Sequence, residues 1–270
     1  MRSAHRKRLA QSLIDEYRVS IRKACRVVMI HSSVWYYQTI SRDDTVIRMR
    51  EIAMIRVRYG FERIFTLLRR EGWKDNHKRV YRLYKLEGLN LRSKRPRRSR
   101  SGAHRLDRHQ ISGINQVWSM DFMSDQLFDG KRFRILTLVD NYSRKCHALE
   151  VGQSLKGMDV VRIMNQVRHE TNQFPIRIQV DNGTEFISKD FDRWAYENNV
   201  TIDYSRPGRP TDNPFIESFN GSLRNECLNT NWFLSLDDAR AKIESFRRDY
   251  NEYRPHSSLQ GLTPNQIESG

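Results

Sequence analysis

Beyond residue 115 the sequence consists of short apolar runs broken by turn residues, and this texture restricts the fold more than any other feature. Three strand-like runs come first: VWSMDFM at 117–123, FRILTLVD at 133–140 and CHALEV at 146–151. Gly130 and the segment 141–143 separate them. Because strands joined by such short turns pair with their neighbours, the pattern predicts a three-stranded meander.

Helical and strand-like stretches alternate after the meander. Apolar spacing predicts helices near 156–171, 188–198 and 213–228, and strands near 176–181 and 201–205. This order is typical of an α/β domain with a mixed sheet. A chain of 270 residues with 38% hydrophobic side chains is long enough to bury the core of such a domain.

The excess positive charge lies in the amino-terminal part of the chain. The formal net charge is +16. Residues 1–112 hold 29 lysines and arginines against 10 acidic residues, whereas residues 113–270 hold 19 against 22. A basic surface attracts polyanions before any specific contact forms. The step in charge therefore predicts a DNA-gripping region followed by a nearly neutral domain with a different task.

The segment 91–112 is predicted to link these two regions. Its middle, RSKRPRRSRSGAHRLDR at 92–108, contains a proline and a glycine and lacks apolar periodicity. A solvated charge run has the same composition. Arginines such as Arg97 and Arg98 would in addition neutralise phosphates on contact with DNA.

The first 90 residues have the spacing of short helices. Apolar residues recur at helical intervals in 46–57, 64–68 and 80–86, and 20–37 has a similar pattern. Small helices joined by tight turns build helix-turn-helix units, although any small basic helical bundle shares this pattern. The basic residues available to face a duplex are Arg63, Lys78, Arg79 and Arg82.

The sequence has neither a membrane span nor a secretion signal. No stretch approaches the roughly 18 uninterrupted apolar residues of a span, and the start MRSAHRKRLA lacks the apolar part of a signal peptide. We therefore expect a cytoplasmic protein without a membrane partner. Cys25, Cys146 and Cys227 have no paired spacing typical of disulfides or zinc sites.

Three carboxylates occupy positions that can converge. Asp121 lies within the first strand, Asp181 ends a later strand, and Glu217 lies in the first turns of the helix after residue 213. An acidic residue inside an apolar strand is costly to bury unless it is paired or bound to metal. Taken alone, Asp181 before Asn182 and Gly183 would be an ordinary turn residue.

The helix that carries Glu217 has a polar face. Asn213, Asn220 and Arg224 lie four residues before, three after and seven after Glu217, on the same side of a helix. Apolar residues lie alongside this face: Phe215, Ile216, Phe219 and Leu223. A polar face that meets acidic strand residues at one edge of a sheet favours a functional site.

Several motifs carry a resemblance to a known family. They are YGFERIFTLLRREGW with HKRVYRLYKLEGL, VWSMDFM, VDNGTEF, GRPTDNPFIESFNGSLRNECL and YNEYRPHSSLQGLTP. The resemblance covers nearly the whole chain, and as a set these motifs are specific. On these motifs the chain resembles the second-reading-frame (OrfB) transposases of bacterial insertion sequences, within the retroviral-integrase-like superfamily.

The resemblance implies a fold and an activity. The fold would be a ribonuclease-H-like integrase core over 113–270, a mixed five-stranded sheet with flanking helices and a C-terminal helix, preceded by an all-α helix-turn-helix DNA-binding region over 1–90. The activity would be that of a DDE-type transposase, which binds the ends of an insertion sequence and catalyses metal-dependent DNA cleavage and strand transfer. Such a protein would work in the bacterial cytoplasm, associated with the nucleoid.

The implied partners follow from the same resemblance. They would be double-stranded DNA, both the terminal repeats of the element and the target, together with further copies of this chain on DNA. The product of an upstream reading frame is a further expected partner. The His and Cys zinc module of retroviral integrases is absent from the sequence, so no structural zinc is expected.

The resemblance also assigns roles to residues. Asp121, Asp181 and Glu217 would be the metal-binding triad. Arg224 matches the family's basic position seven residues after the glutamate, where many relatives have lysine. Arginine keeps the charge and offers a fork for phosphate, so we expect contact with DNA to survive with altered geometry.

Phosphodiester transfer explains why three carboxylates are needed. An oxygen nucleophile must be activated, charge stabilised and a leaving group displaced in line, and two metal ions about 3.5–4 Å apart supply all three functions. Mg²⁺, or Mn²⁺ as a substitute, prefers carboxylate oxygens. We expect Asp121 to bridge two ions while Asp181 and Glu217 hold one each.

Other polar residues near the triad are expected to touch DNA: Asn182, Asn213 and Asn220, beside Arg224. For Asn182 and Asn213, turn and helix-cap duties are equally compatible with the sequence. The ending YNEYRPHSSLQGLTP, with Arg254 and His256, is predicted to be a structural clasp, and His147 a packed core residue.

Two other functions would use the same residues. A DNA-binding repressor that kept this fold and lost the chemistry would need only the basic region, but the three intact carboxylates argue against it. A nuclease of the same fold would cut DNA without joining it. A strand-transfer assay separates a nuclease from a transposase.

Overall fold

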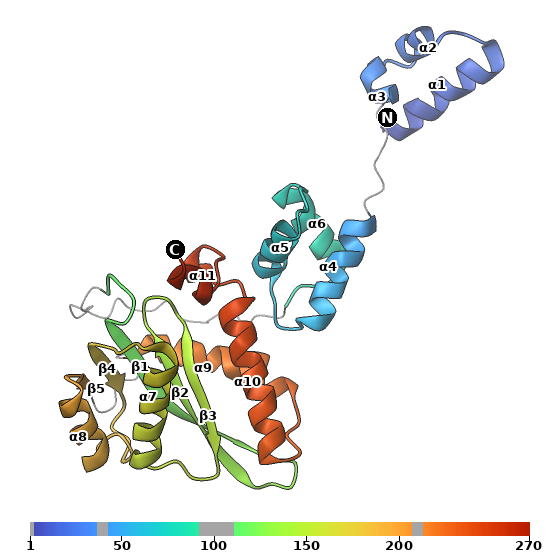
Figure 1. Ribbon diagram of the computed structural model, residues 1–270. Helices are drawn as coiled ribbons and strands as arrows, with labels where there is room; N and C mark the ends of the chain where they lie inside the picture. The colour runs from blue at the N-terminus through green and yellow to red at the C-terminus, as the bar shows by residue number, and fades with distance from the viewer. Residues whose placement is uncertain (1–2, 37–42, 92–110, 207–212) are drawn as a thin grey trace. The chain divides into compact units, whose positions relative to one another are not determined.

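The computed structural model of the chain describes residues 3–36, 43–91, 111–206 and 213–270 (Figure 1). By their contacts these residues form two compact units, Met1–Ile47 and Arg48–Gly270. Nearly all of the predicted linker, including Arg97 and Arg98, lies outside the described residues.

The first unit is helical. It contains α1 (Ser3–Tyr17), α2 (Ile21–Val27) and α3 (Ser32–Tyr36). The short helices predicted within 20–37 are confirmed, whereas α1 was not predicted because its sequence is mostly charged and polar. The buried side chains of this unit include two alanines, Ala10 of α1 and Ala24 of α2, whose small size lets the helices approach one another.

The second unit begins with three helices that have a core of their own. These are α4 (Asp43–Ile55, which starts before the boundary between the units), α5 (Phe61–Arg70) and α6 (His77–Leu86), as the apolar spacing predicts. Their buried residues form one cluster: Met49, Ile52, Tyr59, Phe61, Ile64, Leu67, Leu68, Val80 and Tyr84. Gly72, in the turn between α5 and α6, has φ +88°, which favours glycine.

A five-stranded mixed sheet forms the centre of this unit, with strand order β3-β2-β1-β4-β5 (Figure 1). The strands are β1 (Val117–Gln126), β2 (Arg132–Asp140), β3 (Cys146–Gly152), β4 (Arg177–Val180) and β5 (Thr201–Tyr204). The first three are antiparallel, which confirms the predicted meander. β4 runs parallel to β1, and β5 runs parallel to β4.

Helices cover both faces of the sheet (Figure 1). On one face α7 (Gly157–Thr171) and α8 (Lys189–Glu197) share a core with Trp118 and Met120 of β1. On the other face α9 (Pro214–Glu226) and α10 (Leu236–Glu252) share a core with Met123. Successive residues of a strand point to opposite faces, so odd-numbered positions of β1, including Asp121, face α9.

Short elements complete the chain after α9. They are the 3-10 helices η2 (Leu228–Thr230) and η3 (Ser257–Leu259), on either side of α10, and the terminal helix α11 (Pro264–Glu268). Among the helices of the described segments, none combines the length and apolar character that a membrane crossing requires.

Candidate active site

Asp121 lies in the middle of β1 on the face that packs against α9. Its carboxylate accepts hydrogen bonds from the Phe122 backbone N–H at 2.7 Å and from the Asn220 side-chain amide at 2.7 Å. Thr137, its cross-strand partner on β2, donates to the Asp121 carbonyl at 3.1 Å. These bonds hold the carboxylate at the junction between the sheet and the helix.

Asp181 follows β4 directly and is exposed. Its Oδ1 accepts a hydrogen bond from the Gly183 backbone N–H at 2.9 Å, so the turn role that its neighbours suggest is present. A Cβ atom at position 183 would lie 2.9 Å from that oxygen, so a larger residue would displace the carboxylate. A carboxylate has about four lone-pair positions, and the turn bond therefore leaves room for ligation.

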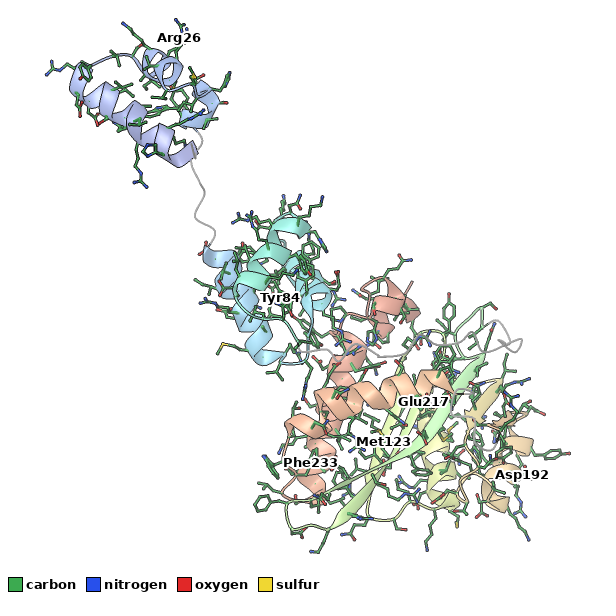
Figure 2. The ribbon with its side chains drawn as sticks, turned by 180° about the vertical axis from the view of Figure 1, so that it is seen from behind. Arg26, Tyr84, Met123, Asp192, Glu217 and Phe233 are labelled. Atoms are coloured by element: carbon green, nitrogen blue, oxygen red, sulfur yellow. The ribbon has the colours of Figure 1, made fainter. Side chains whose placement is uncertain are left out.

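Glu217 lies in the first turn of α9 and is exposed. Figure 2 shows α9 crossing one face of the sheet with Glu217 near its amino end and Met123 of β1 beneath the helix. The Glu217 backbone N–H donates to the Asn213 carbonyl at 3.4 Å, so the position of Glu217 depends on where Asn213 is fixed.

The three predicted carboxylates influence one another electrostatically. Burial raises the pKa of the Asp121 carboxyl to about 6, and the negative charges of Asp181 and Glu217 act in the same direction. The hydrogen bonds from Phe122 and Asn220 oppose this rise in pKa. A cation placed among these groups would relieve both the mutual repulsion and the cost of burying charge.

The donor atoms suit a hard divalent cation. Carboxylate and amide oxygens are the ligands that Mg²⁺ and Mn²⁺ prefer, and the buried Asn220 Oδ1 has no hydrogen-bond partner among the residues that the structure describes. Within the described segments, no three acidic, histidine or cysteine side chains are already arranged to share one ion. The exposed side chains of Asp181 and Glu217 would have to turn toward Asp121 to close a site around an ion.

Asn213 is buried and occupies the N-cap position of α9 without capping the helix through its side chain. Its Oδ1 accepts a hydrogen bond from Ser119 at 2.7 Å, and its Nδ2 donates to the Gln179 carbonyl at 3.4 Å. Of the two roles that the sequence left open for Asn213, the structure does not have the side-chain cap. The side chain points inward to the two central strands, because strand atoms provide its bonding partners.

The other two asparagines also have protein partners. Asn182 is exposed and donates to the Ser205 carbonyl at 2.7 Å, which ties the ends of β4 and β5 together. Asn220 binds Asp121, so the structure places it against a carboxylate. Both positions adjoin residues of the triad.

Arg224 lies on the same face of α9 as Glu217 and Asn220. Its guanidinium donates to Asp125 Oδ2 at 3.2 Å and to the Ser124 carbonyl at 2.9 Å, and its side chain is 38% exposed. Glu226, only two residues further along the helix, is bound by Arg63 and Arg254. Arg224 instead reaches the end of β1.

Glu226 belongs to a separate cluster that involves Arg63 and Arg254. Arg254 is buried and contacts both carboxylate oxygens of Glu226 at 2.7 Å, while Arg63 of α5 reaches the same carboxylate at 2.8 Å. Burial would raise the pKa of Glu226, but bonds and charge from Arg254 and Arg63 hold it below its usual value. Arg63, predicted to face a duplex, thus lies in a partly buried ion pair. His256 Nε2 donates to the Tyr250 carbonyl at 3.0 Å.

The basic residues predicted on α6 differ in their surroundings. Lys78 and Arg82 are exposed, whereas Arg79 pairs with Asp75 at 3.1 Å. Two neighbours not singled out from the sequence, Tyr81 and Lys85, are exposed on the same helix, with the lysine 4.4 Å from the tyrosine ring centroid. Their spacing from Lys78 could have identified them.

Several polar residues beneath the carboxylates were not predicted from the sequence. Ser119 and Asn141 are fully buried, and both contact Gln179 of β4. The signal in the sequence was a serine inside the apolar run VWSMDFM and a glutamine inside IRIQVD. A buried polar side chain in a strand requires a hydrogen-bond partner, so these two residues indicate a polar contact between the strands.

Comparison with known proteins assigns families to most of the chain. Residues 112–210 and 198–264 match models of the integrase core domain, and residues 41–98 match an HTH-like domain. A 31.7 kDa protein of insertion element IS407 from Burkholderia multivorans is 40% identical over 259 residues, which cover 94% of this chain and 92% of that protein. Transposase InsF for insertion sequence IS3A from Escherichia coli K12 is 26% identical, with coverage of 93% and 94%.

A solved structure supports the fold. The simian T-cell lymphotropic virus intasome, determined by cryo-electron microscopy with PP2A regulatory subunit B56 gamma, has a TM-score of 0.52 and 14% sequence identity, and it covers 83% of this chain and 74% of that one. The five-stranded sheet with helices on both faces is accordingly an integrase core, preceded by helices of the HTH-like type. The chain therefore belongs to the OrfB-type transposases of bacterial insertion sequences.

Proposed function

We propose that this protein binds the ends of its insertion sequence and catalyses metal-dependent cleavage and strand transfer of DNA. The observation that carries the proposal is the placement of Asp121 in an integrase core: its carboxylate is half-buried on the face of β1 that packs against α9, where the negative charges of Asp181 and Glu217 act on it. A bound cation would offset the cost of burying the Asp121 charge beside two other negative charges.

The proposed cofactor is Mg²⁺, with Mn²⁺ as a substitute and two ions for each site. Proteins with an integrase core typically use divalent metals. Asp121, Asp181 and Glu217 would hold the ions, which activate the oxygen nucleophile and stabilise charge at the phosphorus. Asn220 keeps the Asp121 carboxylate turned toward α9, and the Gly183 N–H orients Asp181. Water is the nucleophile for cleavage, and a DNA 3′-hydroxyl is the nucleophile for joining.

Arg224 is proposed to contact a phosphate of the reacting DNA end. It lies two helical turns beyond Glu217 and is partly exposed. A guanidinium carries five N–H donors in a planar fork, so it can bind phosphate while it keeps the bond to the Ser124 carbonyl. Asn182, at the exposed end of β4, is proposed as a further contact with DNA.

Duplex binding is proposed for the exposed face of α6, through Lys78 and Arg82 together with Tyr81 and Lys85. Arg97 and Arg98 would add phosphate contacts from the linker. Arg63 and Asn213 are not part of this proposal, because both side chains are committed to bonds inside the protein. The acting form would be a multimer on DNA in the bacterial cytoplasm, with an upstream-frame product as a partner.

A direct assay tests this proposal. The protein is incubated with labelled element ends and a supercoiled target in Mg²⁺ or Mn²⁺, and the products are separated on a denaturing gel. Nicked and joined products are expected, and both should vanish with a chelator. Nicks without joined products would identify a nuclease instead, and DNA binding with neither product would identify a repressor.

A further inference from the structure

We infer that Ser119, Asn141, Gln179 and Asn213 are positioning residues that hold the three carboxylate-bearing elements together. These residues, three amides and one hydroxyl beneath the carboxylates, are called the amide cluster below. The inference rests on the proposed function and deepens it. None of the four side chains carries a charge, and none of them needs to touch an ion or DNA for this role.

Hydrogen bonds connect the amide cluster across three elements and a turn. Ser119 of β1 donates to Asn213 Oδ1 at 2.7 Å, and Asn213 Nδ2 donates to the carbonyl of Gln179 in β4 at 3.4 Å. Asn141, in the turn after β2, donates to Gln179 Oε1 at 3.0 Å. Ser119, Asn141 and Asn213 are 0%, 1% and 7% exposed and Gln179 is half-buried, so water has little access to the bond between Ser119 and Asn213.

Each carboxylate lies close in the sequence to a member of the amide cluster, either two residues along the same strand or one turn along the helix. Ser119 is two residues before Asp121, and Gln179 is two residues before Asp181, so within each strand the pair shares a face. Ser119 and Gln179 are also direct partners in the parallel pairing of β1 with β4. Ser119 and Gln179 therefore lie side by side in the sheet, two residues before Asp121 and Asp181 and on the same face as them.

Helix α9 is joined to these two strand residues by hydrogen bonds of Asn213. Asn213 precedes Glu217 by four residues, one helical turn, and its carbonyl accepts the Glu217 N–H. An asparagine at the N-cap ordinarily uses its side chain to bond the first turn of its own helix. Here the side chain bonds β1 and β4 instead, and these two hydrogen bonds fix the start of α9 against the strands.

Hydrogen bonds suit this task better than apolar contacts would. Apolar contact is non-directional, whereas a hydrogen bond fixes both the distance and the angle between two groups. Ions held by carboxylates from three separate elements require those elements to keep a fixed spacing. Loss of one link should therefore loosen the ion site before it unfolds the domain.

The test measures Mn²⁺ binding to the full-length protein, by electron paramagnetic resonance of free Mn²⁺, together with strand transfer as a function of Mn²⁺ concentration. Ser119→Ala, which removes one oxygen atom, and Asn213→Ala are each expected to weaken Mn²⁺ binding about tenfold. The double variant should bind Mn²⁺ about as weakly as Asn213→Ala alone, because Asn213→Ala already removes the bond from Ser119. Duplex binding should be unchanged.

The matched control is Asn251→Ala. Asn251 is a buried amide that bonds the Cys146 backbone N–H at 2.9 Å and carbonyl at 2.8 Å, on the edge strand β3 and outside the amide cluster. Its loss should lower the melting temperature and leave Mn²⁺ affinity within about twofold of wild type. All variants are compared at a temperature where melting curves show them folded, and Ser119→Ala suffices if Asn213→Ala does not fold.

Two results would overturn the inference. One is normal Mn²⁺ affinity in Ser119→Ala. The other is equal weakening by Asn251→Ala, which would show that any loss of stability has this effect. A wild-type protein that neither binds Mn²⁺ nor joins DNA would instead refute the proposed function.

Discussion

Arg224 shows at the scale of a single residue how the resting structure differs from the proposed working state. Its guanidinium is bound to Asp125 and to the Ser124 carbonyl, and the ion pair is partly exposed. Exposed ion pairs are worth little, so a DNA phosphate can replace Asp125 at low cost. In the proposed working state the Arg224 guanidinium would then contact the reacting DNA end.

Replacing Arg224 tests this account. Arg224→Ala should slow strand transfer from pre-cleaved ends about 10- to 100-fold, because a charge-assisted hydrogen bond is lost. Arg224→Lys should retain much of the rate, since one positive charge remains. Arg240→Ala, which removes an exposed arginine of α10 paired with Asp237, is the control. Wild-type joining by Arg224→Ala would leave the arginine a purely structural role.

His147 is a residue whose charge state governs stability and not chemistry. It is buried against Trp118, with ring centroids 4.1 Å apart, and within the described segments neither ring nitrogen has a hydrogen-bond partner. Burial, reinforced by the charges of Lys145 and Arg247, lowers its pKa to about 3. The unfolded chain therefore takes up a proton near pH 6.5 that the folded protein refuses.

This difference fixes the sign of a pH effect. The stability associated with neutral His147 is fully present above pH 6.5 and falls by about 1.4 kcal/mol per unit as the pH drops toward the folded pKa. His147→Phe should remove this part of the acid sensitivity in urea unfolding between pH 6.5 and 4.5. His169→Gln, at an exposed position of α7, should not. Parallel pH profiles for wild type and His147→Phe would contradict the assignment.

At the scale of elements, periodicity in the sequence was sufficient to predict the meander, the alternating helices and strands, and α4 to α6. Each of these has an apolar face at a regular spacing, which is a local property. The inward turn of Asn213 and the pairing of Arg63 with Glu226 were not predictable, because their partners lie 94 and 163 residues away. Likewise, the three carboxylates could be proposed as a set from the sequence. That their elements are neighbours could be seen only from the strand order, in which β1 lies beside β4.

The element that we expect to grip DNA is α6. Lys78→Glu with Arg82→Glu in the full chain should weaken duplex binding strongly and make it less salt-dependent, by about one unit of slope for each phosphate that the variant no longer binds. Lys131→Glu with Arg132→Glu, which changes two exposed basic residues at the start of β2, is the matched control. Gel shifts at two salt concentrations decide the matter, and equal losses for both pairs would show only a general effect of net charge.

For the whole molecule, the uneven charge separates two tasks. The excess positive charge lies in residues 1–112, whereas the carboxylates lie in the nearly neutral remainder. Basic residues placed among the carboxylates would have their positive field cancelled by the negative charges. Basic residues elsewhere in the chain keep their long-range attraction for DNA. Binding of duplex DNA and chemistry on its ends should therefore respond to different substitutions.

The measurement that tests the central claim most directly is strand transfer from pre-cleaved, labelled element ends in Mn²⁺ by three isosteric variants. Asp121→Asn, Asp181→Asn and Glu217→Gln each remove one negative charge and keep the shape of the side chain. Each should abolish joining while duplex binding, measured on the same samples, remains close to wild type. Near-normal joining by any one variant would contradict the account, because that residue would not then be a metal ligand.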